Sequence, residues 1–171
     1  MNEIGVDYRC PHWRAQSGAI ADTVTRAALA ALADSPRFAL GAAGQGMGPD
    51  DAYEISIVLA DDTFVRDLNR QYRNIDTPTN VLSFPADDDD GLGPCLLGDV
   101  ILAYETVQRE ADAAGKPMLD HVSHLIIHGT LHLLGFDHED EQEAIEMEAL
   151  ETAILARLGI ADPYLAGAGR P

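Results

Sequence analysis

The sequence is short of cysteine and of long apolar runs, and each shortage excludes a class of protein. Its 171 residues include two cysteines, Cys10 and Cys95, which lie far apart and are expected to be free thiols in a reducing compartment. No apolar run approaches the ~20 residues that a membrane-spanning helix needs. Residues 1–13 carry early acidic residues and no long apolar segment, unlike a secretion signal. We therefore expect a cytoplasmic protein with no membrane association.

Basic residues are also scarce. Lys and Arg number 11 against 29 Asp and Glu, and the formal net charge is -18. The imbalance is concentrated in residues 84–171, which hold 18 acidic and four basic residues, whereas residues 1–83 hold 11 acidic residues and seven arginines. Such a chain should bind nucleic acid poorly by charge alone. A nucleic-acid function would therefore need a local concentration of basic side chains.

The pattern of apolar residues predicts one globular domain, since the chain is 46% hydrophobic and 23% charged. Segments rich in β-branched residues or with alternating polarity predict strands at 3–9, 54–60, 81–85 and 95–103. Helical periodicity predicts helices at 18–34, 63–73, 104–115, 119–134 and 139–159. Strands and helices interleave, which predicts a mixed α+β or α/β sheet. We expect a single compact α+β domain, with about four strands packed by four to five helices.

The most informative stretch is HGTLHLLGFDH, residues 128–138. On a helix, His128 and His132 lie one turn apart, so their imidazoles can converge on one point. Gly135 can take the left-handed conformation that ends a helix, which lets His138 reach the same point. If each of the three histidines had an unrelated structural role, nothing would explain why their spacing lets them meet at one point. Three imidazoles leave the fourth position of a tetrahedral Zn²⁺ open, which predicts a catalytic zinc site at the end of a buried central helix.

Other residues could support this site. His124, one turn before His128, could act behind the ligands or line the cleft, whereas His121 is expected at the surface. Asp137 could orient a ligand imidazole through its second nitrogen, or it could only shape the turn. Ser83, in the predicted strand 81–85, could face the cleft.

Gly129 bears on the chemistry. Zinc proteases with this histidine spacing carry a catalytic Glu at that position, and glycine cannot move protons. Because zinc lowers the pKa of bound water to ~7, hydroxide can form unaided, and the step that needs help is an anionic transition state such as that of phosphodiester cleavage. Arginine suits that task, and Arg66, Arg70 and Arg73 form a basic stripe on the predicted helix 63–73.

Four segments resemble the YbeY family of bacterial single-strand-specific, metal-dependent endoribonucleases. They are HGTLHLLGFDH, LNRQYRNIDTPTNVLSFP (68–85), LLGDVIL (96–102) and EMEALE (146–151), which lie within residues 60–155 in the family's order. Residues 1–50 match loosely, and Phe136 stands where many members have Tyr. The resemblance implies one α+β domain with metal ligands His128, His132 and His138 in a groove. It also implies a functionally important arginine at Arg73.

The resemblance further implies maturation of the 3′ end of 16S rRNA and ribosome quality control, with links to the Era GTPase and a small-subunit ribosomal protein. Our hypothesis is that the metal polarises a phosphate or activates water while Arg73 stabilises the developing charge. Arg66 and Arg70 would contact RNA, and docking on a ribosomal protein would add specificity. Residues 1–171 would form one domain, with a flexible tail at 160–171 and a solvated acidic loop at 87–90. Another zinc-dependent hydrolase and a non-catalytic, zinc-stabilised ribosome-assembly factor are the alternatives.

Overall fold

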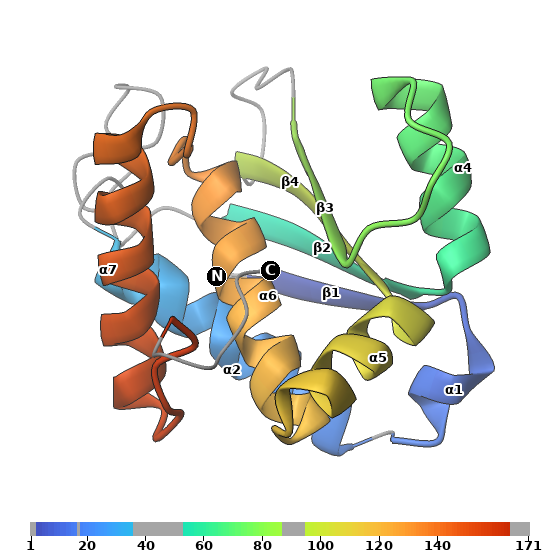
Figure 1. Ribbon diagram of the computed structural model, residues 1–171, viewed down its shortest axis with the longest axis horizontal. Coiled ribbons are helices and arrows are strands. Elements are labelled where there is room, and N and C mark those ends of the chain that lie inside the picture. Colours follow the sequence, from blue (N-terminus) through green and yellow to red (C-terminus); the bar gives the residue numbers. More distant parts are fainter. Residues whose placement is uncertain (1–2, 17, 36–52, 87–94, 165–171) are drawn as a thin grey trace.

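The computed structural model describes residues 3–16, 18–35, 53–86 and 95–164, and within them a four-stranded mixed sheet forms the centre of the molecule (Figure 1). Its strands are β1 (Glu3–Tyr8), β2 (Tyr53–Ala60), β3 (Val81–Pro85) and β4 (Cys95–Ala103), in the order β1-β2-β4-β3. β1, β2 and β4 are parallel, and β3 pairs antiparallel with β4 at the edge. The predicted α+β class and four-stranded mixed sheet are confirmed.

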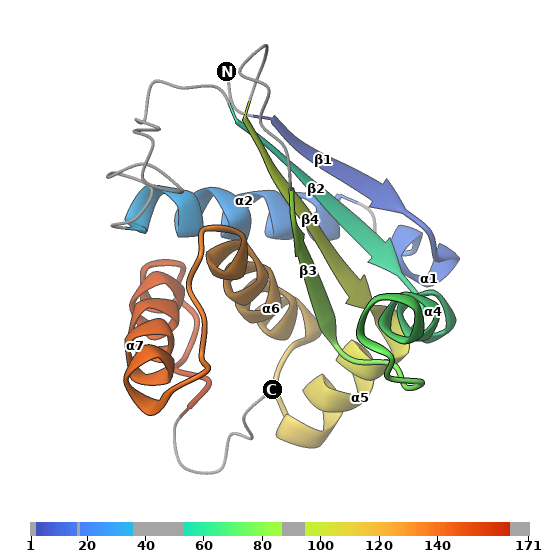
Figure 2. The same cartoon turned by 90° about the horizontal axis from the view of Figure 1, so that it is seen from above.

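Six helices surround this sheet in the described part of the chain. They are α1 (Pro11–Arg14), α2 (Ala19–Asp34), α4 (Asp62–Arg73), α5 (Tyr104–Ala114), α6 (Met118–Leu133) and α7 (Glu141–Arg157). In Figure 2, α2, α6 and α7 lie on one side of the sheet and α4 lies on the other, with α1 near the ends of β1 and β2. The sequence did not predict α1, because four residues are too few to show a period. Its Trp13 is buried and donates from Nε1 to the Ala60 carbonyl at 2.8 Å.

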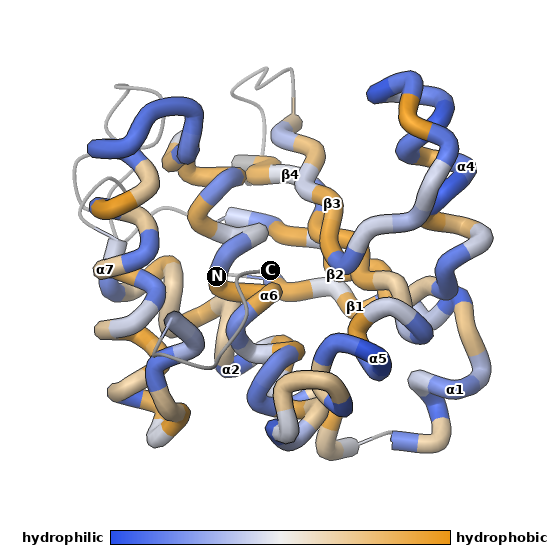
Figure 3. Tube along the Cα trace, in the orientation of Figure 1, coloured by the Kyte–Doolittle hydropathy of each residue, from blue (hydrophilic) through white to orange (hydrophobic). Residues whose placement is uncertain are grey.

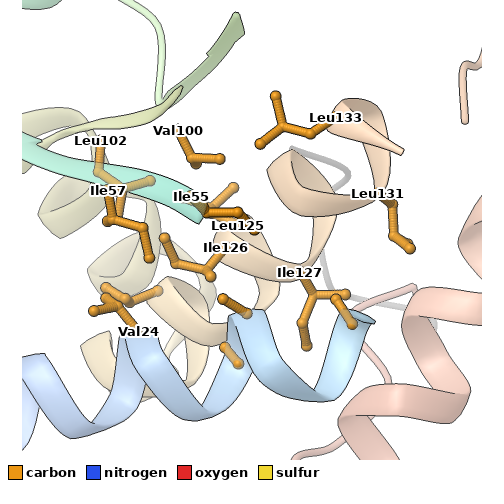
Figure 4. Packing of buried hydrophobic residues seen from close by; sticks show 14 of the residues in the cluster. Val24, Ile55, Ile57, Val100, Leu102, Leu125, Ile126, Ile127, Leu131 and Leu133 are labelled. Carbon is orange, nitrogen blue, oxygen red and sulfur yellow. The ribbon is translucent and has the colours of Figure 1, made fainter. Parts of the chain in front are cut away.

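Alternation along the strands produces two apolar clusters, one on each face of the sheet. Ile55, Ile57 and Val100 belong to the larger cluster, which packs against α2 and α6 (Figure 4). The smaller cluster lies under α4 and includes Val65 and Ile101. The apolar colouring in Figure 3 accordingly follows the strands and α6, while much of α4 is hydrophilic. α6 therefore enters the main core and carries its histidines with it.

The C-terminal end of α6 turns the chain sharply. Gly135 has φ 93°, in the left-handed region that favours glycine, and the Phe136 N–H donates to the Leu131 carbonyl at 3.0 Å. This six-residue cap is the stop that the sequence predicted. It sends residues 136–138 back toward the end of the helix, where they complete the histidine group.

The acidic loop and the C-terminal segment fall wholly or partly outside the described residues. The acidic loop 87–90 lies outside the described residues, as does 165–171. Residues 160–164 differ from the expected tail, because the Ile160 N–H donates to the Leu155 carbonyl at 2.9 Å and Tyr164 contacts side chains of the core. None of the described helices is both long and apolar enough to cross a membrane.

Candidate metal centre

Three histidines converge at the end of α6. Each of His128, His132 and His138 offers one ring nitrogen, and these three atoms lie within 4.8 Å of one another. The Nε2 atoms of His128 and His132 are 3.1 Å apart. That distance is close to the separation of two nitrogens that bind one zinc ion at about 2.0–2.1 Å. His128 and His132 are half-buried and His138 is exposed, so the group opens to solvent on one side.

The hydrogen bonds behind the rings determine which nitrogen carries a lone pair. His132 Nδ1 lies 2.9 Å from the Phe136 carbonyl oxygen. Because a carbonyl only accepts, Nδ1 donates, and the lone pair of this neutral ring is on Nε2. His128 Nδ1 contacts a carboxylate oxygen of Glu151 and donates to it. The lone pairs of both Nε2 atoms therefore point into the same space, where a cation would relieve their repulsion.

The electrostatics favour a neutral His132 and a charged carboxylate behind the histidine group. Burial lowers the pKa of His132, which keeps this imidazole uncharged and able to bind a metal at neutral pH. Burial would raise the pKa of Glu151, but its contacts with His124 and His128 outweigh that effect and lower the pKa to about 2. Glu151 is thus ionised across the physiological range. A carboxylate behind a metal-binding histidine fixes its orientation and raises its basicity.

Glu151 is the main site residue that the sequence analysis missed. It is fully buried and is reached by both His128 and the hydroxyl of Tyr164, which donates to its second oxygen. The sequence carried a signal, since Glu151 falls on the buried face of α7 together with Met147 and Ile154. A carboxylate in an apolar stripe needs a partner inside the protein. Tyr164 had no comparable signal, because its position depends on the fold of the chain after α7.

The structure assigns different roles to the other predicted neighbours. His124 is buried behind the ligands, with Nε2 3.1 Å from the Tyr164 hydroxyl and 3.6 Å from Glu151. Asp137 accepts the backbone N–H of His138 at 2.8 Å, so it shapes the turn. The imidazole of His128 is oriented by Glu151 instead. His121 was predicted at the surface, and this was wrong. It is 3% exposed, with Nε2 2.9 Å from Glu110.

At Gly129, α6 packs tightly against the sheet. A Cβ on this residue would lie 2.7 Å from Val100 Cγ1 and 2.9 Å from Ser83 Oγ. Ser83 also donates from its hydroxyl to the Gly129 carbonyl at 3.1 Å, and it is among the residues that line the groove. A glutamate at 129 would force the side chains of Val100 and Ser83 to shift. The packing therefore disfavours any side chain at this position, the catalytic glutamate of a zinc protease included.

The histidines lie in a groove of about 920 Å³ that runs along the edge strand β3. The groove is lined by His128, His132 and His138 toward α7, by residues 78–85 along β3, and by Glu110 and Arg73 farther away. The Arg73 guanidinium donates to Asn69 Oδ1 at 3.3 Å, and the buried Asn69 amide in turn donates to the Thr77 carbonyl at 2.9 Å. The structure thus brings Arg73 and the three histidines to one groove.

The basic stripe on α4 is weaker than the sequence indicated. Arg66 makes a two-point ion pair with Asp76, at 2.9 and 3.1 Å, and Arg70 contacts Asp67 at 3.3 Å. The hydrogen bond with Arg66 lowers the pKa of Asp76, so both members of that pair are charged at neutral pH. Neither Arg66 nor Arg70 lines the groove. Only Arg73 of the three has a neutral hydrogen-bond partner among the described residues.

Comparisons with known proteins match most of the chain. The family model described as Endoribonuclease YbeY matches residues 21–159. The endoribonuclease YbeY of Paramagnetospirillum magneticum is 53% identical over 95% of both chains, and that of Rhodospirillum rubrum is 52% identical over 94% of this chain and 80% of the relative. A solution structure of a Thermotoga maritima protein, 18% identical over 91% of each chain, has the same fold with a TM-score of 0.52.

Proposed function

The chain belongs to the YbeY family of endoribonucleases, as its four motifs predicted. We propose that it cleaves single-stranded RNA with a zinc ion held by His128, His132 and His138. The observation that carries the proposal is that the Nε2 atoms of His128 and His132 lie 3.1 Å apart, each with its lone pair directed at the same space. Among the described residues, no fourth side chain joins the group, so a bound ion would keep a position for water or substrate. Three imidazoles also suit other divalent transition metals.

The protein's own residues divide the remaining work. A bound zinc ion supplies Lewis acidity toward a phosphoryl oxygen or an attacking water. Glu151 holds His128 in the tautomer that presents Nε2, and the Phe136 carbonyl does the same for His132. Arg73 stabilises the negative charge that develops on the phosphate, and Asn69 positions its guanidinium without neutralising it. One domain spanning residues 1–171 carries these groups.

The groove supports the preference for single strands. It is bounded by β3 on one side and by the turn after α6 on the other, and a flexible single strand can follow such a groove more readily than a stiff duplex. With a net charge of -18, the isolated protein binds RNA weakly by charge alone. Docking on the small ribosomal subunit then supplies specificity for the precursor of 16S rRNA. Era and a small-subunit ribosomal protein are the proposed partners, and the cytoplasm is the proposed location.

Two other functions are weaker. The tight packing at Gly129 argues against a zinc protease, because it disfavours a carboxylate base at that position. A purely structural zinc site normally takes a fourth protein ligand. The opening of the group toward solvent at His138 therefore favours catalysis over a binding-only assembly factor.

Cleavage of matched substrates tests the proposal. The purified chain would be incubated with a single-stranded fragment from the 3′ end of a small-subunit rRNA precursor, and with the same fragment annealed to its complement. We expect the single strand to be cut, the duplex to be spared, and cleavage to stop on chelation and return with added zinc. Equal cleavage of both substrates would contradict the strand preference. Undiminished cleavage after chelation would contradict the role of the metal.

A further inference from the structure

An exposed aromatic ring lies next to the catalytic arginine. Tyr72 is 64% exposed although it is an aromatic residue of α4, and it directly precedes Arg73 in the sequence. Its ring contacts Phe84 of β3, with centroids 5.3 Å apart and an interplanar angle of 57°. Phe84 itself lines the groove. Tyr72 therefore contacts a groove-lining residue from the α4 side of the edge strand β3, and it does not line the groove itself.

Exposure alone is no sign of function, because single exposed apolar side chains are common on protein surfaces. Two further observations distinguish Tyr72. Its neighbour Arg73 has no carboxylate partner among the described residues, in contrast to Arg66 and Arg70. In addition, the contact with Phe84 restricts the orientation of the Tyr72 ring, so less side-chain entropy is lost when a ligand covers it. An aromatic ring of restricted orientation, on the residue before an uncompensated cation, offers the two contacts that single-strand binding uses, stacking on a base and charge against the backbone.

We propose that Tyr72 is a stacking platform for one unpaired base of the RNA, next to the nucleotide whose phosphate Arg73 contacts. This proposal rests on the proposed function, since the ligand is a single-stranded RNA that enters the same groove. Stacking is tolerant of sequence because every base has an aromatic face, so the platform would select single strands without selecting a base. It would also compensate for the acidic surface, because stacking does not depend on net charge.

The platform makes a specific kinetic prediction. Stacking holds the substrate equally in the ground state and the transition state, so its loss raises KM and leaves kcat nearly unchanged. Removal of one base–aromatic contact weakens binding roughly 5- to 150-fold. We therefore expect Tyr72→Ala to raise KM by that factor with its metal content intact. Tyr72→Phe and Tyr72→Trp should keep a KM near that of the wild type, since both retain an aromatic face.

A series of abasic substrates locates the contact. Each substrate is the same single-stranded RNA with one base removed, and kcat/KM is measured for the wild type, for Tyr72→Ala, and for Leu29→Ala as a control that truncates an exposed apolar side chain on α2. In the wild type, one abasic position near the cleavage site should reduce kcat/KM. In Tyr72→Ala the same position should cause no further loss. The Leu29→Ala profile should match that of the wild type.

The possible failures are distinguishable. If the wild type cleaves no single-stranded RNA, the proposed function fails and the platform fails with it. If the wild type cleaves but Tyr72→Ala has the wild-type KM, or if every abasic position acts additively with Tyr72→Ala, the platform is overturned and the proposed function stands. A Tyr72→Phe variant as impaired as Tyr72→Ala would also overturn stacking, because it would assign the effect to the hydroxyl.

Discussion

His128 and His132 face each other through their Nε2 atoms across 3.1 Å, while their Nδ1 atoms contact Glu151 and the Phe136 carbonyl, respectively. Both Nδ1 atoms are donors, so neither Nε2 of the neutral rings has a proton to share with the other. Two lone pairs at this distance repel in the absence of a cation. The arrangement of the two rings therefore favours binding of a cation between them. His138 offers a third ring nitrogen to the same ion.

Replacing the carboxylate behind His128 should weaken metal binding. Glu151→Gln keeps the size of the side chain but removes its charge, and the loss of such a supporting carboxylate typically costs 10–100-fold in metal affinity. We expect a decrease in that range when zinc affinity is measured by competition with a chelating dye. Glu146→Gln, on the exposed face of the same helix, is the matched control. Equal zinc affinities in the two variants would contradict a role for Glu151 in metal binding.

Gly129→Ala should destabilise the fold. Alanine is the better helix former by about 1 kcal/mol, but its Cβ would lie 2.7 Å from Val100 Cγ1 in the core. Overpacking of this kind typically costs about 1–3 kcal/mol, so the clash should win in urea unfolding. Gly5→Ala is the control, because there the nearest atom would be the Ile55 carbonyl oxygen at 3.9 Å. A stabilised Gly129→Ala protein would show that α6 has room to move from the sheet.

Arg73→Ala should abolish most cleavage and leave the metal in place. Loss of one group that stabilises transition-state charge typically reduces kcat by about 10²–10³. Arg70→Ala removes a neighbouring arginine whose charge is already compensated by Asp67, so its kcat should stay near the wild-type value. Zinc content and kcat would be measured on the same preparations. Zinc loss in Arg73→Ala would assign a structural role to this residue.

The stability contributed by Glu110 should depend on pH. Burial would raise the pKa of Glu110, but hydrogen bonds with His121 and Asn80 outweigh it and lower the pKa below the ordinary value of 4.5. A group with a depressed pKa in the folded state stabilises the protein above its unfolded-state pKa, and this contribution is lost as pH falls through the folded-state value. The difference in unfolding free energy between wild type and Glu110→Gln should thus be present at pH 7 and shrink below pH 4.5.

Denaturant titrations at several pH values would measure this difference. Asp112→Asn, on the exposed side of the same helix, serves as the control, because its partner is the neutral side chain of Gln108. A Glu110→Gln difference that stays constant from pH 7 to pH 3 would mean that the carboxyl contributes through packing and not through its charge.

The parts of the structure that depend on local pattern could be predicted from the sequence. The strands and the five longer helices follow from periodicity, and in the structure Asp61 caps α4 by accepting the Phe64 N–H at 2.8 Å. The end of α6 follows from the conformational freedom of Gly135. The convergence of the histidines then follows from helical spacing, because all three lie within 11 residues.

Contacts between distant segments could not be predicted in this way. Glu151 reaches His128 from another helix, and Tyr164 reaches both Glu151 and His124 from beyond α7. The pairing of Arg66 with Asp76 depends on how the loop after α4 folds back, so a stripe of arginines in the sequence overstated the exposed positive charge. The reason for Gly129 likewise became visible only when Ser83 and Val100 were placed against it.

Metal content paired with cleavage is the measurement that tests the central claim most directly. Wild type and His132→Ala would be purified alike, analysed for bound metal by mass spectrometry, and assayed on one single-stranded rRNA fragment. We predict one zinc or other divalent ion per wild-type chain, little or none in His132→Ala, and cleavage in proportion to the bound metal. Full metal occupancy in His132→Ala, or cleavage by a metal-free preparation, would contradict the account.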